Sequence, residues 1–430
     1  MDRFEYRDGQ MFCEEVSMDE LASMFGTPLY VYSRNTFAHH YDAITSAFAP
    51  LKPLICYSIK SCGNLHIVKM LAERDSGMDV VSGGELFRAQ KAGADMSKIV
   101  YAGVGKTDDE IRMGIDAGIG YFNIESEAEF ENIARIASEM GKTTRGALRV
   151  NPDVDPETAH AKTTTGKKES KFGVDIERAK RFFANYGKDP NVKLCAIHLH
   201  IGSPVYKVEP YVSSITKALQ LIDELRAEGY EITAIDIGGG YGANYVADQT
   251  PPYEAYAEKI VPLLQPFVDD GGQIILEPGR TIACNAGVLL GKVQYIKTGG
   301  RKKFVILDTG MHHLVRPAMY DSFHFIWPTN VTTNHVPDKR LTEMPNEGLE
   351  PCDIVGPICE TGDCFAKDRA IPPVARGDLL AIFSAGAYGM VMASQYNAMP
   401  RPAEVMVDGK DATLIRRRET YDDLIAAEGV

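Results

Sequence analysis

Residues 194–202 read Leu-Cys-Ala-Ile-His-Leu-His-Ile-Gly, a short apolar run that ends in polar residues and a glycine. Such a run, bounded by turn residues, predicts a buried β-strand. The chain continues into Glu209–Glu228, where apolar residues recur at three- and four-residue steps until Gly229. This spacing is typical of an amphipathic helix that ends at a glycine. A buried strand followed by a helix is the repeating unit of a parallel α/β sheet.

The same unit recurs along the first 280 residues. Seven further apolar runs are separated by stretches of helical spacing: Leu54–Ser61, Met78–Ser82, Lys98–Gly103, Tyr121–Glu125, Gly146–Asn151, Ile232–Gly238 and Gln273–Glu277. Eight strands alternating with helices over about 250 residues predict a (β/α)₈ barrel of the TIM type. A doubly wound open sheet has the same alternation and is the alternative, but the strand count favours the barrel.

The pattern changes after Arg280, where hairpin signals replace the alternation. Two pairs of apolar runs flank the turn sequences Thr298-Gly-Gly-Arg301 and Asp408-Gly-Lys-Asp411. These pairs predict a mainly β domain, a sandwich or barrel, in the C-terminal part of the chain. Residues 328–354 are rich in Pro, Thr and Asn, and we expect long loops there.

Tyr30-Val-Tyr32 is a short strand candidate outside the eight barrel runs. We therefore expect residues 1–30 to form an N-terminal segment that joins the β domain. The predicted organisation is this segment, a barrel over residues 31–281 and a C-terminal β domain over residues 282–430.

Composition narrows the function classes. The 430 residues carry 59 Asp and Glu against 46 Lys and Arg, a formal charge of −13. A chain this acidic, without a basic run, is a poor partner for nucleic acid. It has no run of about 18 apolar residues and no apolar leader, so we expect neither a membrane span nor export. Its eight cysteines are scattered, which is typical of reduced thiols in the cytoplasm.

Catalytic groups of a (β/α)₈ barrel lie where the strands end. The predicted strand ends carry unusually polar residues: Lys60, Asp79, His198, His200, the run Gly238–Gly240, Glu277 and Arg280. Each has a structural explanation when it is taken alone. A strand-end lysine is usually solvated, and tight turns use glycine as freely as phosphate sites do.

We do not expect a metal site. His198 and His200 share one strand face and are candidates either for metal ligands or for ordinary core histidines. The sequence provides no third ligand at a convincing spacing, and Cys352, Cys359 and Cys364 lack the usual zinc spacing.

Taken together, the strand-end residues suit pyridoxal phosphate. Its aldehyde needs a lysine, which Lys60 offers, and its ring needs a flat partner such as His200. Its phosphate needs backbone N–H groups at close approach, which Gly238–Gly240 permit. Its pyridine nitrogen needs an anion in order to remain protonated, and Glu277 is the candidate.

A set of motifs along the whole chain resembles the diaminopimelate decarboxylase family. The motifs are Tyr57-Ser-Ile-Lys60, Asp79-Val-Val-Ser-Gly-Gly-Glu85, Ser170-Lys-Phe-Gly173, His198-Leu-His-Ile-Gly-Ser203, Gly238-Gly-Gly240, Glu277-Pro-Gly-Arg280, Arg316-Pro-Ala-Met-Tyr320, Cys359-Glu-Thr-Gly-Asp363 and Gly386-Ala-Tyr-Gly389. This family belongs to the fold-type III pyridoxal-phosphate decarboxylases, which are relatives of alanine racemase. The resemblance implies an alanine-racemase-like barrel followed by a C-terminal β domain.

The resemblance also implies a role for each site residue. Lys60 would hold the cofactor aldehyde, His200 would stack on its ring, and Glu277 would bind its pyridine nitrogen. The other cofactor-binding residues would be Asp79, Ser203, Gly239, Gly240, Gly279, Arg280 and Tyr388.

On the substrate side, the resemblance implies that Arg280, Arg316 and Tyr320, beside Tyr388, grip the distal carboxylate. Glu360 would bind the distal ammonium, and Cys359 would protonate the carbanion after CO₂ leaves. In this family the loop with Cys359 and Glu360 reaches the second subunit's site, so a homodimer with shared active sites is implied.

The expected reaction is decarboxylation of meso-2,6-diaminopimelate to L-lysine, the last step of lysine biosynthesis. The alternatives are a decarboxylase of ornithine, arginine or carboxynorspermidine, and a non-catalytic pyridoxal-phosphate-binding protein. Arg316 together with Glu360 favours diaminopimelate over ornithine, because only diaminopimelate has a second amino-acid head. Glu277 argues against a racemase, since racemases of this fold place an arginine at the pyridine nitrogen.

Overall fold

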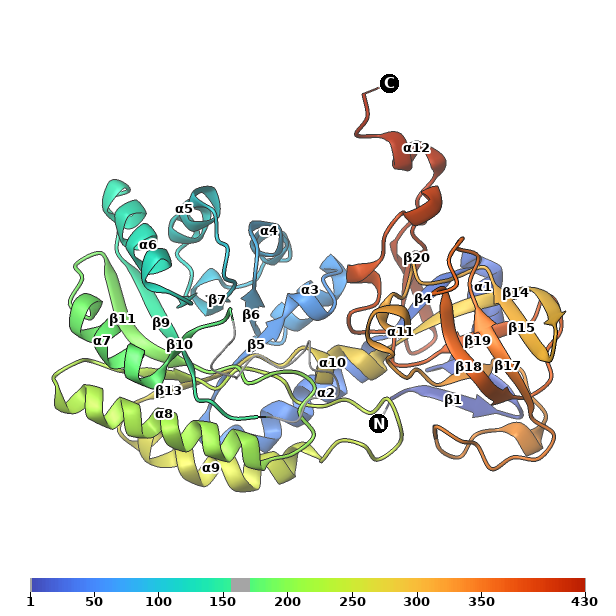
Figure 1. Ribbon diagram of the computed structural model, residues 1–430, viewed down its shortest axis with the longest axis horizontal. Coiled ribbons are helices and arrows are strands. Elements are labelled where there is room, and N and C mark those ends of the chain that lie inside the picture. Colours follow the sequence, from blue (N-terminus) through green and yellow to red (C-terminus); the bar gives the residue numbers. More distant parts are fainter. Residues whose placement is uncertain (1, 156–170, 430) are drawn as a thin grey trace. The chain divides into compact units, whose positions relative to one another are not determined.

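The computed structural model describes residues 2–155 and 171–429 and divides into two compact units (Figure 1). The barrel unit consists of residues 41–155, 171–242 and 250–281, and the β unit of residues 2–40, 243–249 and 282–429. The division falls within helices α2 (Arg34–Ala47) and α10 (Arg280–Ala283). Ser170, the first residue of the Ser170–Gly173 motif, lies outside the described residues.

The barrel unit contains eight parallel strands joined in a ring. They are β5 (Leu54–Ser58), β6 (Gly77–Val80), β7 (Ile99–Tyr101), β8 (Tyr121–Ile124), β9 (Thr144–Asn151), β11 (Val192–His198), β12 (Ala234–Asp236) and β13 (Gln273–Leu276). Sequential strands pair with each other, and β13 pairs back onto β5 through Ile275 and Leu54. The ring has no free edge, so the predicted (β/α)₈ barrel is confirmed and the open sheet is excluded. A two-residue strand, β10 (Val174–Asp175), adds to β9.

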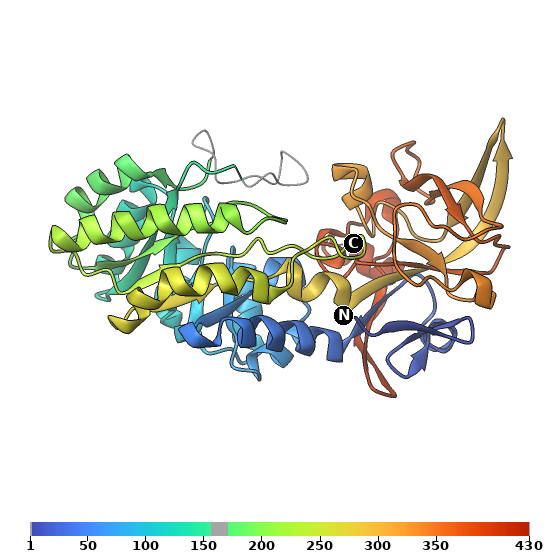
Figure 2. The same cartoon turned by 90° about the horizontal axis from the view of Figure 1, so that it is seen from below.

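Helices follow the strands and form the outer layer of this unit. They are α3 (Leu65–Ala72), α4 (Gly83–Lys91), α5 (Asp108–Ala117), α6 (Glu127–Glu139), α7 (Ile176–Tyr186), α8 (Glu209–Ala227) and α9 (Tyr253–Asp269). The two longest, α8 and α9, lie side by side (Figures 1 and 2). None of the helices in residues 2–155 and 171–429 is long and apolar enough to cross a membrane.

Short polar side chains set the helix starts directly after the strands. Ser82, Ser126 and Asp175 accept the backbone N–H three residues ahead at the starts of α4, α6 and α7. Thr107 and Glu110 form a reciprocal capping box at the start of α5. These bonds satisfy N–H groups that a helix leaves unpaired in its first turn, so the capping residues fix where α4, α5, α6 and α7 begin.

The β unit is built on one nine-stranded sheet with the order β18-β17-β15-β14-β4-β20-β21, onto which β19 and β16 also pair. Its strands are β4 (Leu29–Ser33), β14 (Gly287–Gly299), β15 (Lys302–Leu307), β16 (Ile326–Pro328), β17 (Glu350–Val355), β18 (Cys364–Ile371), β19 (Leu379–Ile382), β20 (Ala403–Asp408) and β21 (Asp411–Arg416). A smaller sheet joins β1 (Phe4–Arg7), β2 (Gln10–Cys13) and β3 (Val16–Ser17), and the helices are α1 (Met18–Phe25), α11 (Arg316–Tyr320) and α12 (Tyr421–Ile425).

Both predicted hairpins are present, as β14–β15 and β20–β21. The predicted strand at Tyr30–Tyr32 is the centre of β4, which pairs with β14 on one side and with β20 on the other. The loop expected over residues 328–354 ends earlier than predicted, because β17 begins at Glu350. Glu350 and Pro351 hid this strand in the sequence, since both residues are uncommon in strands. Residues 350–355 form a strand because they pair with β15 and β18.

A buried histidine pair precedes α11 in the β unit. His312 and His313 are each 2% exposed, and their ring centroids are 3.6 Å apart. His313 contacts Thr309 and the carbonyl of Pro400, whereas neither ring nitrogen of His312 has a partner among the described residues. Burial lowers the pKa of His312 from 6.5 to about 4, so the imidazole is neutral at pH 7.

We expect the substitution His312→Leu to reduce the acid sensitivity of folding. A histidine whose pKa is lower in the folded state stabilises the fold fully above pH 6.5, and this contribution is lost as the pH falls toward 4. Between pH 7 and pH 5, the free energy of unfolding should therefore fall by about 1–2 kcal/mol less in the variant than in the wild type. Urea denaturation at both pH values measures this, with exposed His66→Gln as the control. Equal losses in the wild type and in His312→Leu would contradict the prediction.

Candidate active site

The carboxyl ends of the barrel strands bring four predicted site residues to one end of the barrel. Lys60 lies in a short 3₁₀ turn (Ile59–Ser61) directly after β5, and Asp79 lies within β6. His200 lies two residues beyond the end of β11, and Glu277 follows β13 directly. Because all eight strands are parallel, these ends meet at the same mouth.

Lys60 is held by a buried carboxylate. Its Nζ lies 2.6 Å from Oδ2 of Asp79, whose side chain is fully buried, and the hydroxyl of Ser58 donates to the same oxygen. Burial and the nearby Glu277 raise the pKa of Asp79, while the Lys60 ammonium opposes that rise. The pair therefore fixes the position of the lysine nitrogen at the barrel mouth.

Glu277 is a buried, ionised carboxylate that accepts two side-chain hydrogen bonds. It is 3% exposed; Asn123 Nδ2 donates to Oε1 at 2.9 Å, and His198 Nε2 lies 3.3 Å from Oε2. Burial alone would raise its pKa, but the charge and hydrogen bond of His198, together with Lys60, lower the pKa of Glu277 well below its usual range. An ionised carboxylate is thus presented inside the barrel.

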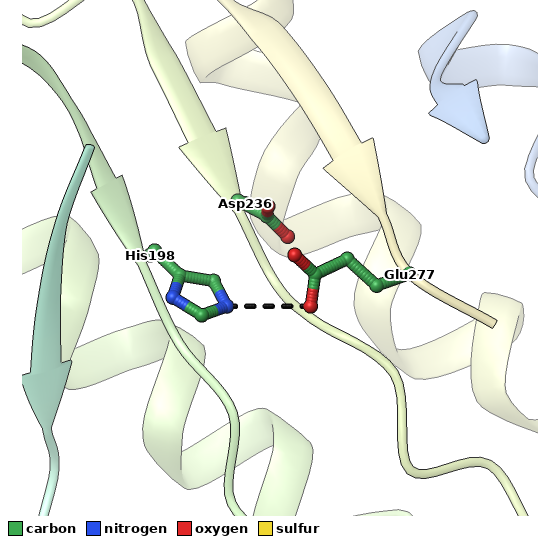
Figure 3. Close-up of side chains that lie close together, drawn as sticks. All are labelled: His198, Asp236 and Glu277. Carbon is green, nitrogen blue, oxygen red and sulfur yellow. Dashed lines mark hydrogen bonds and ion pairs between the residues drawn. The ribbon is translucent and has the colours of Figure 1, made fainter. Parts of the chain in front are cut away.

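A second acid, Asp236 at the end of β12, lies against this carboxylate (Figure 3). Oxygen or nitrogen atoms of His198, Asp236 and Glu277 lie within 4.8 Å of one another, a spacing at which side chains can share a cation. Burial and Glu277 raise the pKa of Asp236 well above its usual range. The proximity of the two carboxyl groups therefore favours the protonated form of Asp236 and leaves the negative charge on Glu277.

His200 is a neutral imidazole beside the glycine run. Burial, with Arg149 and Lys60 nearby, lowers the pKa of His200 well below 6.5. The backbone N–H of Gly239 donates to its Nδ1 at 3.4 Å, so this nitrogen acts as an acceptor. The ring is half-buried and uncharged, which suits it to stacking on another flat ring.

The glycine run Gly238–Gly240 is packed so closely that no other residue fits. A Cβ on Gly238, Gly239 or Gly240 would lie 2.2, 2.1 or 2.2 Å from a neighbouring carbonyl oxygen. Gly238 and Gly240 also have φ values of 71° and 94°, which favour glycine. This cradle of bare backbone is what close approach to a phosphate group requires.

Two further predicted residues contact each other beside the glycine run. Nε of Arg280 donates to the hydroxyl of Ser203 at 3.0 Å, and Arg280 is 6% exposed. A Cβ on Gly279 would lie 2.7 Å from the Cβ of Ser58, so this residue allows the segment after β13 to pack against the end of β5.

The remaining predicted residues belong to the β unit. Arg316, at the start of α11, is 7% exposed, and its guanidinium carbon lies 5.4, 5.7 and 5.9 Å from the ring centroids of Tyr245, Tyr320 and Tyr388. The three aromatic rings stabilise the positive charge of the guanidinium and restrict its orientation. The structure thus brings together three of the predicted substrate-side residues, Arg316, Tyr320 and Tyr388.

Cys359 and Glu360 lie on an exposed loop between β17 and β18. The N–H of Cys359 donates to Asn397 at 3.1 Å, and the Tyr396 hydroxyl donates to the Glu360 carboxylate. Both side chains are therefore exposed at the surface of the β unit, on a loop that hydrogen bonds to Asn397 and Tyr396 hold in place.

Asp363 shapes this loop from beneath. It is 4% exposed; its Oδ1 accepts the N–H of Met311 at 2.6 Å, and its Oδ2 accepts the N–H of Ile358 at 2.7 Å. A Cβ on Gly310 or Gly356 would lie within about 2.5 Å of this carboxylate, so both positions need glycine. One buried carboxylate therefore ties the Cys359 loop to the turn that leads into α11.

The sequence analysis missed two residues that contribute to these contacts, and it gave no role to the strand-end residue Asp236. Asn123 and Asp236 support Glu277, and Tyr245 supports Arg316. Asn123 could have been found, because a polar side chain stands between Phe122 and Ile124 in a buried strand. Tyr245 carries no such signal, since it lies in a loop that only the fold places beside α11.

Comparison with known proteins agrees with this geometry. Residues 34–284 match the family model described as pyridoxal-dependent decarboxylase, pyridoxal binding domain. The diaminopimelate decarboxylase of Aquifex aeolicus is 45% identical over 422 residues, which are 98% of this chain and 96% of that protein. The chain belongs to the diaminopimelate decarboxylase family. It is therefore a carboxy-lyase that depends on pyridoxal phosphate.

Solved structures of the family share the whole fold. The diaminopimelate decarboxylase of M. jannaschii in complex with L-lysine has a TM-score of 0.91 and 38% identity, covering 100% of this chain and 98% of that one. The enzyme of Helicobacter pylori in complex with L-lysine has a TM-score of 0.88 and 37% identity, with 95% and 98% covered. The lysine/ornithine decarboxylase of Vibrio vulnificus, at 20% identity and a TM-score of 0.77, shares the fold.

We expect Asp363→Asn to loosen the Cys359 loop. Asparagine keeps one acceptor oxygen and turns an NH₂ toward the second N–H, so one buried N–H loses its partner. Backbone amides of residues 356–363 should exchange with deuterium about tenfold faster or more. Hydrogen-exchange mass spectrometry measures this. The matched control is Asp353→Asn, which removes a carboxylate that accepts from Asp368 and Lys302 in the same unit; if both variants left the loop unchanged, the anchoring role would be refuted.

Proposed function

We propose that the chain converts meso-2,6-diaminopimelate into L-lysine and CO₂ by decarboxylation at the D-centre, the last step of lysine biosynthesis. Family membership over almost the full length supports this reaction. Two relatives were solved with L-lysine, which is the product of the proposed reaction.

The observation that carries the proposal is the buried Glu277 carboxylate directly after β13, held by Asn123 and His198. A carboxylate that is 3% exposed is costly to bury unless cations face it. The protonated ring nitrogen of pyridoxal phosphate is a cation that suits this place. When bound, the cofactor supplies an electron sink, and a carboxylate at its ring nitrogen keeps that sink strong.

The barrel residues fit the rest of the cofactor. Lys60, placed by Asp79, is the amine that binds the aldehyde, and the neutral His200 offers a face to the ring. The Gly238–Gly240 run carries no side chain that could cover its backbone N–H groups, which fits a phosphate at close approach. We assign phosphate binding to Ser203, Gly239, Gly240, Gly279, Arg280 and Tyr388.

The β-unit residues suit a substrate with a second amino-acid head. We assign the distal carboxylate to Arg280, Arg316 and Tyr320, and the distal ammonium to Glu360. An unpaired charged head is expensive to bury, so such a pocket also rejects substrates that lack that head. Cys359 holds the proton that is delivered to the carbanion after CO₂ leaves.

A homodimer with shared active sites is part of the proposal. Cys359 and Glu360 are both exposed in the single chain, although their roles require contact with substrate. A second copy that receives this loop would cover both side chains and exclude water from the proton donor.

We further assign cofactor binding to residues 31–281 and the C-terminal β domain to residues 282–430. The family model that covers residues 34–284 supports this division. We also propose a cytoplasmic location. None of the eight cysteines, all of which lie among the described residues, is in a disulfide, as expected in a reducing compartment.

Substrate assays test the reaction. We expect the purified protein with pyridoxal phosphate to release CO₂ and L-lysine from meso-diaminopimelate, and to act at least 100-fold less efficiently on ornithine, arginine or carboxynorspermidine. The large difference is expected because these substrates would leave the Arg316 guanidinium without a carboxylate. Efficient turnover of ornithine alone would overturn the substrate assignment, and cofactor binding without turnover of any substrate would indicate a non-catalytic binding protein.

Subunit mixing tests the shared site. Lys60→Ala and Cys359→Ala subunits are each expected to be inactive, and Lys60→Ala should also lose the visible absorbance of lysine-bound pyridoxal phosphate. A mixed dimer combines one intact Lys60 with one intact Cys359 in a single site, so about a quarter of the wild-type activity should return. The control mixes two differently tagged Lys60→Ala proteins. If subunit exchange is demonstrated and activity stays absent, each site is built from one chain.

A further inference from the structure

A tyrosine of helix α8 holds the glycine run from the outer side of the barrel. The Tyr211 hydroxyl donates to the carbonyl oxygen of Gly239 at 3.0 Å, and Tyr211 is 2% exposed. A Cβ on Gly240 would approach the same hydroxyl to 3.0 Å. The phenol therefore contacts the middle of the run, at the peptide unit that joins Gly239 to Gly240.

The geometry of that peptide unit determines where the N–H of Gly240 points. A trans peptide is planar, and its C=O and N–H point in opposite directions. When Tyr211 binds the carbonyl of Gly239, the N–H of Gly240 must point away from α8. Glycines on both sides give this peptide access to more than one orientation, since glycine adopts positive and negative φ equally well, and a hydrogen bond to the carbonyl favours one of them.

Neighbouring contacts hold the adjoining backbone as well. The carbonyl of Gly240 accepts the N–H of Val205 at 2.8 Å, and the Tyr256 hydroxyl donates to the carbonyl of Val205 at 3.0 Å. The hydrogen bond that orients the Gly239–Gly240 peptide within this segment is the one that Tyr211 donates.

Three tyrosines form the support behind the run. The rings of Tyr211 and Tyr241 are stacked at 5.1 Å between centroids, and Tyr256 packs edge-on against both. All three are buried, at 1–2% exposure. Their hydroxyls differ: those of Tyr211 and Tyr256 bind carbonyls, whereas the hydroxyl of Tyr241 has no partner among the described residues.

We propose that Tyr211 is a positioning residue for the phosphate group of the cofactor: its hydroxyl fixes the Gly239–Gly240 peptide so that the Gly240 N–H faces the phosphate. The inference rests on the proposed function, which assigns the phosphate to this run. Burial together with Tyr241 and Tyr256 raises the pKa of Tyr211 well above 10, so the phenol remains a hydrogen-bond donor at every pH at which the protein is used.

The test compares two phenylalanine variants in the full-length protein. Tyr211→Phe removes the hydrogen bond, and Tyr241→Phe removes a neighbouring hydroxyl that has no partner. For each apoprotein, the dissociation constants of pyridoxal phosphate and of pyridoxal, which lacks the phosphate, are measured from the visible absorbance of the lysine-bound ligand. The ratio of the two constants isolates the contribution of the phosphate.

In Tyr211→Phe, the preference for pyridoxal phosphate over pyridoxal should fall about three- to tenfold, the effect of one hydrogen bond. The affinity for pyridoxal itself should be unchanged, which a general packing defect would not allow. Inorganic phosphate should also compete less well with pyridoxal phosphate in this variant. Tyr241→Phe should match the wild type in all three measurements.

Two outcomes would count against the inference. An unchanged ratio in Tyr211→Phe would overturn it, as would an equal fall in both variants, because packing rather than the hydrogen bond would then be responsible. Failure of the cofactor assignment on which the inference rests is distinguishable, since the wild type would then show no lysine-bound absorbance with either ligand.

Discussion

Closure of the barrel is the constraint on which the rest of the site depends. The pairing of β13 with β5 joins the last barrel strand to the first, and all eight strands run in the same direction. Residues that are widely separated in the sequence, such as Lys60 and Glu277, therefore reach one mouth. In an open sheet the two edge strands would lie far apart, and these groups could not face a single ligand.

The polar groups at this mouth tolerate burial because they form hydrogen bonds and ion pairs with one another. Asp79 faces the ammonium of Lys60, and Glu277 faces His198 and Asn123. Burial and the neighbouring Glu277 raise the pKa of Asp236, which disfavours two adjacent buried anions. This arrangement presents one amine and one carboxylate at fixed positions before any ligand arrives, which lowers the cost of binding and orienting a ligand.

Much of the fold follows from local sequence. The eight apolar runs and both hairpin turns act through contacts within a few residues, so pattern and turn chemistry reveal them, and the caps at Ser82, Thr107 and Ser126 are equally local. The strand β17 was hidden, because Glu350 and Pro351 are poor strand residues and long-range pairing with β15 and β18 overrides their preference. Among the site residues, Asn123 carried a signal as a polar residue in a buried strand, whereas Tyr245 carried none.

The sequence by itself determined the barrel, the two-part organisation and the chemical types at the strand ends, because strand and helix periods and polar strand ends are properties of neighbouring residues. Only the tertiary structure decided which of these groups are charged and what holds them. The ionised state of Glu277 depends on His198, and the orientation of the Gly239–Gly240 peptide depends on Tyr211. Protonation and peptide orientation are set by burial and by partners from other elements, and those partners meet only after the chain has closed into a barrel.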